Sequence, residues 1–258
     1  MGKADLHIHT IYSWDGTCTV EAVLKQAAHI AELDVIAITD HNDIRGALEA
    51  VELAPHYGIE VVPGCEISSA DGHLLALFIQ KKIPTGLSAM ETVLRVQELG
   101  GLCIVPHLEA KYSHGMYEQT VRDALKDRRV QQTLRGMETF NASLFDKSSY
   151  GKALKFSQEL TLAKIGSSDS HLNWTIGYGI TLFPGHTADD LRTAIESGIT
   201  ASYPAKNIAF ALILLGWLRG HFLRRAGWVE YNRHPDAPVR LERMPSLARF
   251  SGNRVVAN

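Results

Sequence analysis

Short, almost uninterrupted apolar runs alternate along this chain with longer stretches in which apolar residues recur at helical spacing. Apolar side chains at successive positions are typical of strands that are buried on both faces, as in a parallel sheet covered by helices. The predicted strands span residues 4–10, 34–39, 59–64, 73–79, 101–107, 135–141 and 163–169. Strands and helices in repeated succession predict an α/β fold with a mainly parallel sheet.

The helical stretches carry recognisable start and stop signals. They span residues 19–33, 43–58, 86–101 and 190–198. Thr19 is the predicted cap of the first helix, and Ser88 with Glu91 forms a predicted capping box for the third.

The alternation stops near Pro204, and this change predicts a boundary in the 258-residue chain. We expect residues 1–204 to form the α/β domain and residues 205–258 to form a basic extension of unknown role. From Arg219 onward the chain has eight arginines and three acidic residues, although its formal net charge is −2, so the preceding part is acidic. Such tails are mostly solvated or packed on their own domain, and contact with a nucleic-acid backbone is the alternative.

The longest apolar run, residues 208–218, is shorter than the about 20 residues that a membrane-spanning helix needs. We expect a buried helix there, and the alternative is a helix on a membrane surface, because basic residues follow directly. Three scattered cysteines, Cys18, Cys65 and Cys103, indicate buried thiols in a reducing compartment rather than a disulfide framework. Because no secretory signal pattern is present, these features predict a cytoplasmic protein without a transmembrane segment.

Histidines and carboxylates recur where the predicted strands end. They are His7, His9, Asp15, Asp40, His41, Glu66, His73, His107, Asp169 and His171. A lone histidine of this kind is usually a core residue, but the carboxyl ends of strands in α/β folds converge on one rim, where chemistry is found. The remaining histidines, at positions 29, 56, 114, 186, 221 and 234, are predicted to be structural or on the surface.

The pattern predicts a metal centre. His7 and His9 stand two apart on a strand, so both imidazoles point to the same side. Imidazole nitrogens and carboxylate oxygens suit zinc, manganese and iron, and Glu66 is the natural candidate to bridge two ions. Without Asp40, the nine other residues are too many ligands for one ion and predict two or three divalent ions. Asp5 shares the face of the two histidines and is predicted either to support a ligand or to anchor a turn.

The motifs HIHT, SWDG, ITDHN, GCEIS, VPH and GSSDSH, in this order over roughly residues 4–200, resemble the PHP (polymerase and histidinol phosphatase) family. The resemblance implies a distorted (β/α)7 barrel with a metal centre at the C-terminal ends of its strands. It implies one ion held by His7, His9, Glu66 and Asp169, a second by Glu66, His73 and His107, and a third by Asp15, His41 and His171. It also implies that Asp40 orients an imidazole.

The resemblance further implies hydrolysis of a phosphomonoester or nucleotide-type substrate by a metal-activated hydroxide. His171, Asp169 and Asp40 are the predicted catalytic residues, with His171 or a water protonating the leaving group. Arg135, Lys111 and Lys147 are the candidates for binding substrate phosphate. The alternatives are a histidinol phosphate phosphatase, a 5′–3′ exonuclease on short nucleic acids, and a non-catalytic metal-bound module. The sequence leaves the exact substrate, the metal and the oligomeric state open.

Overall fold

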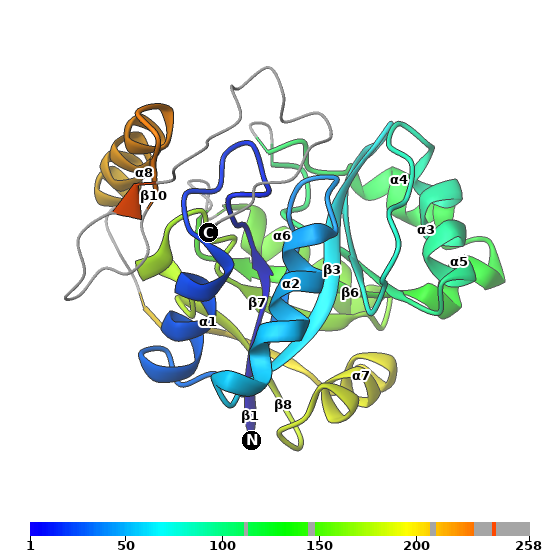
Figure 1. Cartoon of the computed structure of the whole chain (residues 1–258). Coiled ribbons are helices and arrows are strands. Elements are labelled where there is room, and N and C mark those ends of the chain that lie inside the picture. Colours follow the sequence, from blue (N-terminus) through cyan, green and yellow to red (C-terminus); the bar gives the residue numbers. More distant parts are fainter. Residues whose placement is uncertain (111–112, 144–147, 207–209, 230–238, 241–258) are drawn as a thin grey trace.

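A strongly curved mixed sheet forms the centre of the computed structural model, which describes residues 1–110, 113–143, 148–206, 210–229 and 239–240 (Figure 1). Within these residues the order of its nine strands is β7-β6-β5-β4-β3-β2-β1-β8-β9. The strands are β1 (Gly2–Ile8), β2 (Val35–Ile38), β3 (Glu60–Ser69), β4 (Gly72–Leu77), β5 (Leu102–Val105), β6 (Leu134–Asn141), β7 (Ala163–Ser167), β8 (Gly179–Phe183) and β9 (Ala201–Pro204). Two further short strands, β10 (Trp228–Val229) and β11 (Val239–Arg240), pair with each other.

The curved sheet closes where β1 meets the segment that follows β7. His9 N donates to Ser170 O at 2.8 Å, and Ser170 N donates to His7 O at 3.1 Å. β1 is therefore bonded to β2 on one side and to the chain after β7 on the other. Closure of the sheet within a layer of helices confirms the predicted distorted (β/α)7 barrel.

The sheet is mixed rather than mainly parallel. The pairs β1–β2, β2–β3, β5–β6 and β6–β7 are parallel, whereas β1–β8, β3–β4, β4–β5 and β8–β9 are antiparallel. Only Ala70 and Asp71 separate β3 from β4, and such a short connection forms a hairpin because a parallel crossover needs a dozen or so residues. The hairpin places His73, at the start of β4, opposite Ser68, at the end of β3.

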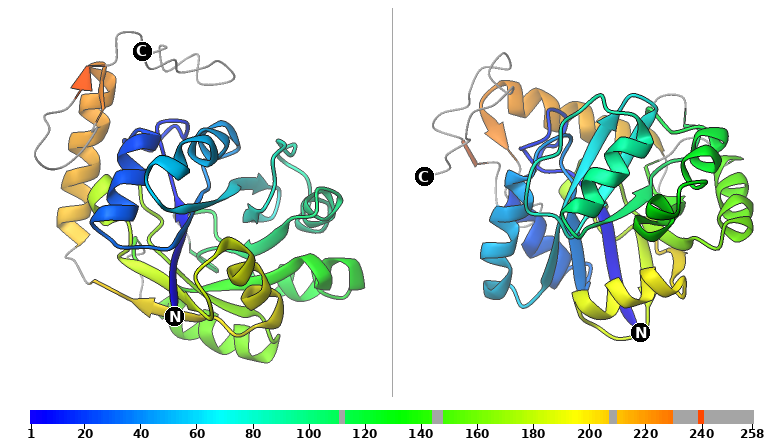
Figure 2. Two further views of the ribbon diagram at one scale, coloured as in Figure 1. Left: turned by 60° about the horizontal axis from the view of Figure 1, so that its bottom comes forward. Right: turned by 90° about the vertical axis from the view of Figure 1, so that its right-hand side faces the viewer.

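Helices cover the outside of the barrel and one of its ends (Figure 2). They are α1 (Val20–His29), α2 (Arg45–Leu53), α3 (Ala89–Glu98), α4 (Glu118–Ala124), α5 (Arg128–Thr133), α6 (Ser148–Glu159), α7 (Ala188–Ser197) and α8 (Phe210–Arg225), with 3₁₀ turns at Ala54–His56 and Asn173–Thr175. Thr19 caps α1 and Ser88 with Glu91 forms the capping box of α3, as predicted. The strands β8 and β9 and the helices α4, α5 and α6 were not predicted, because their apolar patterns are short.

Two apolar layers stabilise the barrel. One lies inside it, where Leu6, Leu75 and Ile165 pack with Leu191 of α7, which covers the end at which the N-terminus lies (Figures 1 and 2). The other lies between the sheet and the surrounding helices. The three cysteines are buried and free, which confirms their prediction as core thiols.

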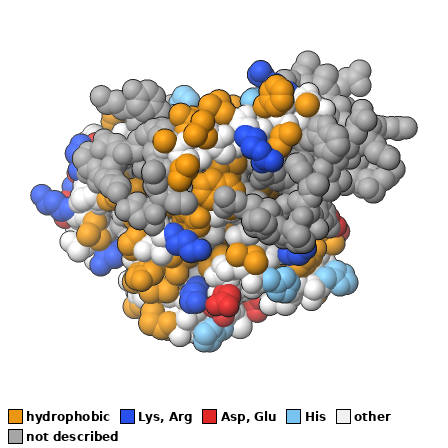
Figure 3. Space-filling model, turned by 90° about the vertical axis from the view of Figure 1, so that its left-hand side faces the viewer, with side chains coloured by type: hydrophobic (Ala, Val, Ile, Leu, Met, Phe, Trp, Pro, Cys, Tyr) orange, Lys and Arg blue, Asp and Glu red, His pale blue; other side chains and the backbone are white. Residues whose placement is uncertain are grey.

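The helix α8 lies at the opposite end of the barrel and leaves much of its apolar surface exposed (Figures 1 and 3). The exposed side chains are Leu212, Leu214, Leu215, Leu218 and Phe222, the last of them 72% exposed. The expectation of a buried helix is therefore wrong for this face, whereas Gly216 and Gly220 of α8 lie against Leu172 and Thr17 of the rim loops. In the part of the chain that the structure describes, no helix combines the length and the apolarity needed to cross a bilayer. Most of the basic tail after α8 lies outside the described residues.

Asp5 anchors the segment that follows β7. Its carboxylate is buried and accepts hydrogen bonds from Ser168 N at 2.9 Å and from Gly177 N at 2.8 Å. Burial raises the pKa of Asp5 to about 6, while the hydrogen bonds from Ser168 and Gly177 oppose the rise. Of the two roles predicted for Asp5, the structure supports that of an anchor.

Replacement of Asp5 by Ala should lower the free energy of unfolding by about 2–4 kcal/mol, because one buried and one partly buried N–H group would lose their acceptor. Chemical denaturation monitored by circular dichroism measures this change. Asp189→Ala, at an exposed position in the first turn of α7, should cost less than about 1 kcal/mol. An Asp5→Ala variant as stable as the wild type would contradict the anchoring role.

Candidate metal centre

His7 and His9 meet two carboxylates at the C-terminal rim of the barrel. His7 Nε2 lies 3.2 Å from Glu66 Oε2 and 3.4 Å from Asp169 Oδ1. His9 Nε2 lies 3.3 Å from each of the same two oxygens. β1 ends at Ile8, but His9 stays in phase with His7 because its N–H remains bonded to Ser170. The first predicted ligand group is thus brought together.

Glu66 stands at the middle of the histidines. Its Oε1 lies 2.8 Å from His73 Nδ1 and 3.0 Å from His107 Nε2. Its Oε2 lies 3.1 Å from His41 Nδ1 in addition to the two contacts described above. The second predicted group is therefore also assembled, with Glu66 in the bridging position. The β3–β4 hairpin makes this possible, because it turns the start of β4 back to the rim.

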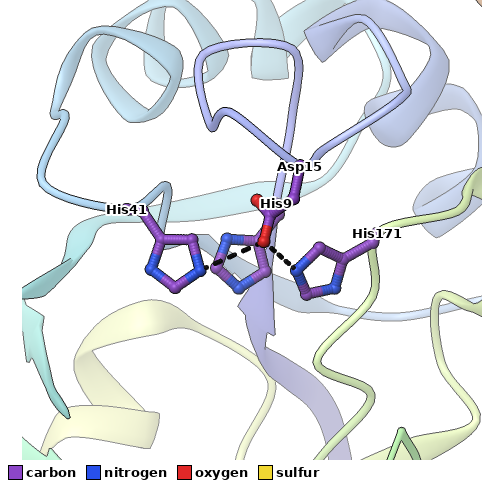
Figure 4. A group of neighbouring side chains, drawn as sticks. All are labelled: His9, Asp15, His41 and His171. Atoms are coloured by element: carbon purple, nitrogen blue, oxygen red, sulfur yellow. Dashed lines mark hydrogen bonds and ion pairs between the residues drawn. The ribbon is translucent and has the colours of Figure 1, made fainter. Parts of the chain in front are cut away.

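Asp15 links the third predicted group (Figure 4). Asp15 Oδ2 lies 3.1 Å from His171 Nε2 and 3.4 Å from His41 Nε2. His9 lies between these two imidazoles and stacks on His171 with ring centroids 4.2 Å apart. One potential ligand atom from each of these four residues lies within 4.8 Å of the others. His9 therefore faces both the first and the third group.

The chemistry of this cluster fits divalent cations. Asp15 Oδ1 and His107 Nδ1 are buried and form no hydrogen bond within the described residues, whereas His9 Nε2 and His73 Nδ1 face carboxylate oxygens at 2.8–3.3 Å. Buried polar atoms without a partner are costly, and ion coordination removes that cost. Imidazoles combined with carboxylates are ligands of zinc, manganese and iron.

The imidazoles and carboxylates of the cluster strongly shift one another's pKa values. Burial alone lowers the pKa of His7, but the neighbouring Asp169, Glu66 and Glu138 carboxylates raise it well above its usual range. Burial likewise raises the pKa of Glu66, but His41 and His7 bring it well below the ordinary value. Burial, with the nearby His171 and His41, lowers the pKa of His9 to about 3.

Glu138 of β6 is a buried residue of the site that the sequence analysis missed. Its Oε1 lies 2.8 Å from His7 Nδ1 and accepts a hydrogen bond from Ser167 Oγ. Its Oε2 accepts hydrogen bonds from His107 N at 2.9 Å and from Asn141 Nδ2 at 2.9 Å. The available signal was a carboxylate three residues before the end of a predicted strand, residues 135–141.

Two candidate ligands have unusual backbone angles. His107 has φ of 30° and Asp169 has φ of 49°, in the left-handed region that non-glycine residues rarely adopt. Glu138 holds His107 through its N–H. Asn141 Nδ2 and Ser143 Oγ donate to Asp169 Oδ2 at 3.2 and 2.9 Å. Strain of this kind persists where surrounding contacts impose it and gathers at functional sites.

Asp40 does not orient an imidazole directly. Its carboxylate accepts hydrogen bonds from Thr10 N at 2.6 Å, Thr10 Oγ1 at 2.7 Å and Ser13 N at 3.2 Å. Ser13 Oγ in turn lies 3.0 Å from His9 Nδ1 and accepts a hydrogen bond from His41 N. Asp40 thus shapes the loop after β1, and Ser13 contacts the imidazole of His9.

Of the three predicted phosphate-binding cations, Arg135 is the one within the described residues, and it lies away from the site. Arg135 lies at the start of β6, at the other end of the strand from Asn141, and donates to the carbonyls of Gln131 and Glu196. The structure does not bring it to the cluster. Lys111 and Lys147 lie outside the described residues.

A cavity of about 370 Å³ opens onto the cluster. Besides the candidate ligands, its lining includes Trp14, Asn42, Ser68, Ser113 and His114, and no described lysine or arginine. Trp14 is 59% exposed and stacks on His41 with centroids 6.2 Å apart. His114, predicted to be structural or on the surface, has its ring centroid 5.5 Å from that of His73 and faces this cavity.

The fold and the clustered donors define an α/β barrel with candidate metal ligands at one rim. Comparison with known families gives a match to the PHP domain over residues 5–151 and to a PHP-associated region over residues 148–200. The chain belongs to the PHP domain family, as its motifs predicted. The matched region ends four residues before the predicted boundary at residue 204.

Individual relatives agree with this assignment. An uncharacterized protein of Methanocaldococcus jannaschii is 42% identical over 150 residues, which cover 54% of this chain and 82% of that protein. A phosphoribosyl 1,2-cyclic phosphate 1,2-diphosphodiesterase of Eggerthella lenta is 37% identical over 86 residues, which cover 31% of this chain and 32% of that enzyme. The fold resembles that of a two-domain protein of Bacteroides vulgatus that contains a predicted PHP-like metal-dependent phosphoesterase. The two structures superpose with a TM-score of 0.66 and 19% sequence identity, and the match covers 85% of this chain and 69% of that one.

Replacement of Glu138 by Gln should weaken the binding of divalent ions by about 10–100-fold, because His7 would lose the charged partner of its Nδ1. Equilibrium dialysis with manganese or zinc followed by elemental analysis measures the affinity. Glu98→Gln, on the exposed side of α3, is the matched control and should bind ions as the wild type does. Equal affinity in all three proteins would refute the role of Glu138.

Divalent ions should also stabilise the fold. At a free ion concentration of about 100 times Kd, the free energy of unfolding should rise by about 2.7 kcal/mol, and Tm by about 5–10 °C. Thermal unfolding with and without manganese or zinc tests this, and Asp169→Asn should reduce the gain. A Tm that does not respond to either ion would speak against a metal centre.

Proposed function

We propose that this protein is a metal-dependent phosphoesterase that hydrolyses a phosphomonoester or a nucleotide-type substrate. The observation that supports this most is the convergence of nine imidazole and carboxylate groups at one rim of the barrel, where five imidazoles face the carboxylate of Glu66. Membership of the PHP domain family and the relationship to a cyclic phosphate diesterase support the same reaction class.

The residues would divide among ions as follows. His7, His9, Glu66 and Asp169 would hold one ion, Glu66, His73 and His107 a second, and Asp15, His41 and His171 a third. Bound ions of this kind lower the pKa of water and neutralise phosphate oxygens. The protein's own part is to hold these donors in place, through Glu138 at His7 and Ser13 at His9.

His171 is oriented for ligation. Its Nδ1 lies 3.0 Å from the carbonyl oxygen of Asp169, which accepts a hydrogen bond, so Nε2 faces Asp15. Burial lowers the pKa of His171, but Asp15 and then Asp169 raise it to about 9. Its role in protonating the leaving group stays a prediction.

The cavity supports a small phosphorylated substrate. The candidate ligands face this cavity, so the ions that they would hold could neutralise a phosphate there. The exposed indole of Trp14 offers a flat apolar surface at the same cavity, suited to the organic part of a substrate. The set of donors predicted from the motifs is complete, which favours an active enzyme over a non-catalytic module.

The proposal is tested by phosphate release from a panel of aryl phosphate, histidinol phosphate, nucleoside mono- and bisphosphates and a short 5′-phosphorylated oligonucleotide, with manganese or zinc present. His9→Ala and Asp169→Asn should each lower turnover by more than about 100-fold, because each is placed among the ligands. His186→Ala, at an exposed histidine outside the cluster, should leave turnover unchanged. Turnover that persists after chelation and in both variants would exclude this mechanism.

A further inference from the structure

The loop of residues 10–17, which carries Asp15, forms hydrogen bonds on two sides. On the barrel side, Asp40 accepts three hydrogen bonds from Thr10 and Ser13. On the outer side, the Arg224 guanidinium of α8 reaches into the loop and donates to its main-chain carbonyls. Nη1 donates to Ser13 O at 2.6 Å and to Gly16 O, and Nη2 donates to Ile11 O at 3.0 Å.

Arg224 is buried to an extent that is unusual for its residue type. Its side chain is only 2% exposed, although it comes from an otherwise largely exposed helix. Arginine is almost never fully buried unless its charge and its donors are matched by acceptors. Its planar guanidinium presents several donors in a fixed geometry, so one side chain can hold three carbonyls at once. Two of these carbonyls belong to Ser13 and Gly16, which lie on either side of Asp15 in the chain.

The helix α8 also lies unusually close to the rim loops. A Cβ added at Gly220 would lie 2.8 Å from Thr17 Cγ2, and one added at Gly216 would lie 3.0 Å from Leu172 Cδ1. Thr17 Oγ1 donates to His171 O at 2.6 Å and so joins the two loops. α8 is therefore in contact with two of the three segments that present the third ligand group, those of Asp15 and His171.

We propose that Arg224 is a positioning residue of the metal centre, which fixes the Asp15 loop and through it the ion site formed by Asp15, His41 and His171. The helix α8, which follows the predicted boundary at Pro204, then stabilises the site and is not a separate extension. The consequence for ion binding rests on the proposed function, whereas the ordering of the loop does not.

A purely structural anchor and a positioning residue differ in what their removal changes. Loss of an anchor lowers the stability of the whole chain and leaves the ion sites of the folded protein equal to those of the wild type. Loss of a positioning residue loosens residues 10–17 in the folded state and weakens one ion site more than the others. The experiment therefore needs a local readout and a count of ions.

The first arm measures amide hydrogen exchange by mass spectrometry, without added metal, in Arg224→Met and in the matched control Arg225→Met. Met keeps an apolar stem of similar length, and Arg225 is the exposed neighbour on the same helix. Exchange in peptides covering residues 10–17 should rise about tenfold or more in Arg224→Met only, with β3 and β4 unchanged. Equal exchange in both variants overturns the proposal.

The second arm counts manganese or zinc per chain after equilibrium dialysis. Arg224→Met should bind its weakest ion about tenfold less tightly, the lower end of the range for groups that support ligands. The same substitution made in an Asp15→Asn background should have no further effect, because the site it supports is already impaired. Additive losses in the double variant overturn the proposal.

Two further variants protect the test against simple misfolding. Arg224→Lys keeps the charge but cannot hold three carbonyls. The rate of amide hydrogen exchange in its residues 10–17 should therefore lie between the rates in the wild type and in Arg224→Met. Gly220→Ala leaves Arg224 intact and pushes α8 from Thr17, so it should loosen the same loop. If Arg224→Met does not fold, wild-type exchange in both of these variants overturns the proposal. If the wild type binds no ion, the proposed function fails while the exchange arm still decides the role of Arg224.

Discussion

The buried carboxylate of Glu66 is the interaction on which the rest of the site depends. It is 1% exposed, and both of its oxygens face imidazole nitrogens at 2.8–3.3 Å. A buried ionised group is tolerated only where opposite charge or coordination compensates the loss of water. Histidines from four different strand ends provide that compensation here. Closure of the barrel brings those strand ends together. The β3–β4 hairpin adds His73, because an antiparallel β4 starts at the rim where β3 ends, whereas a parallel β4 would start at the opposite end of the barrel.

Around this centre lies a layer of polar groups that bind the backbone and the outer nitrogens of the ligands. Glu138 contacts the far nitrogen of His7 and holds the strained backbone at His107. Asp5 and Asp40 hold the segments that carry Asp169 and Asp15, respectively. Each of these carboxylates is buried and fully engaged, so the candidate ligands are fixed before any ion binds. Such preorganisation is what a metal site needs, because loosely held ligands bind ions weakly.

The motif at His7 and His9 illustrates how far local sequence reasoning reaches. Two histidines at a spacing of two share one side of a strand, and the recurrence of histidine and carboxylate at later strand ends predicts one common rim. The barrel and the three ligand groups were implied by the resemblance to the PHP family, whereas the sequence pattern predicted the α/β class and the common rim. It could not anticipate β8 and β9 or the exposed face of α8, because short strands lack a clear period and an apolar run shows apolarity, not the side on which it packs.

What the sequence by itself determined is the identity of the donor residues and their convergence, since both follow from residue type and from position relative to the strands. What only the tertiary structure decided is which groups support those donors. Glu138 contacts a histidine 131 residues away, and Arg224 bonds a carbonyl 213 residues away. Asp40 binds Thr10 and Ser13 rather than the adjacent His41. No periodicity or local spacing encodes such pairs, because they arise only when closure of the barrel and the packing of α8 bring distant segments into contact.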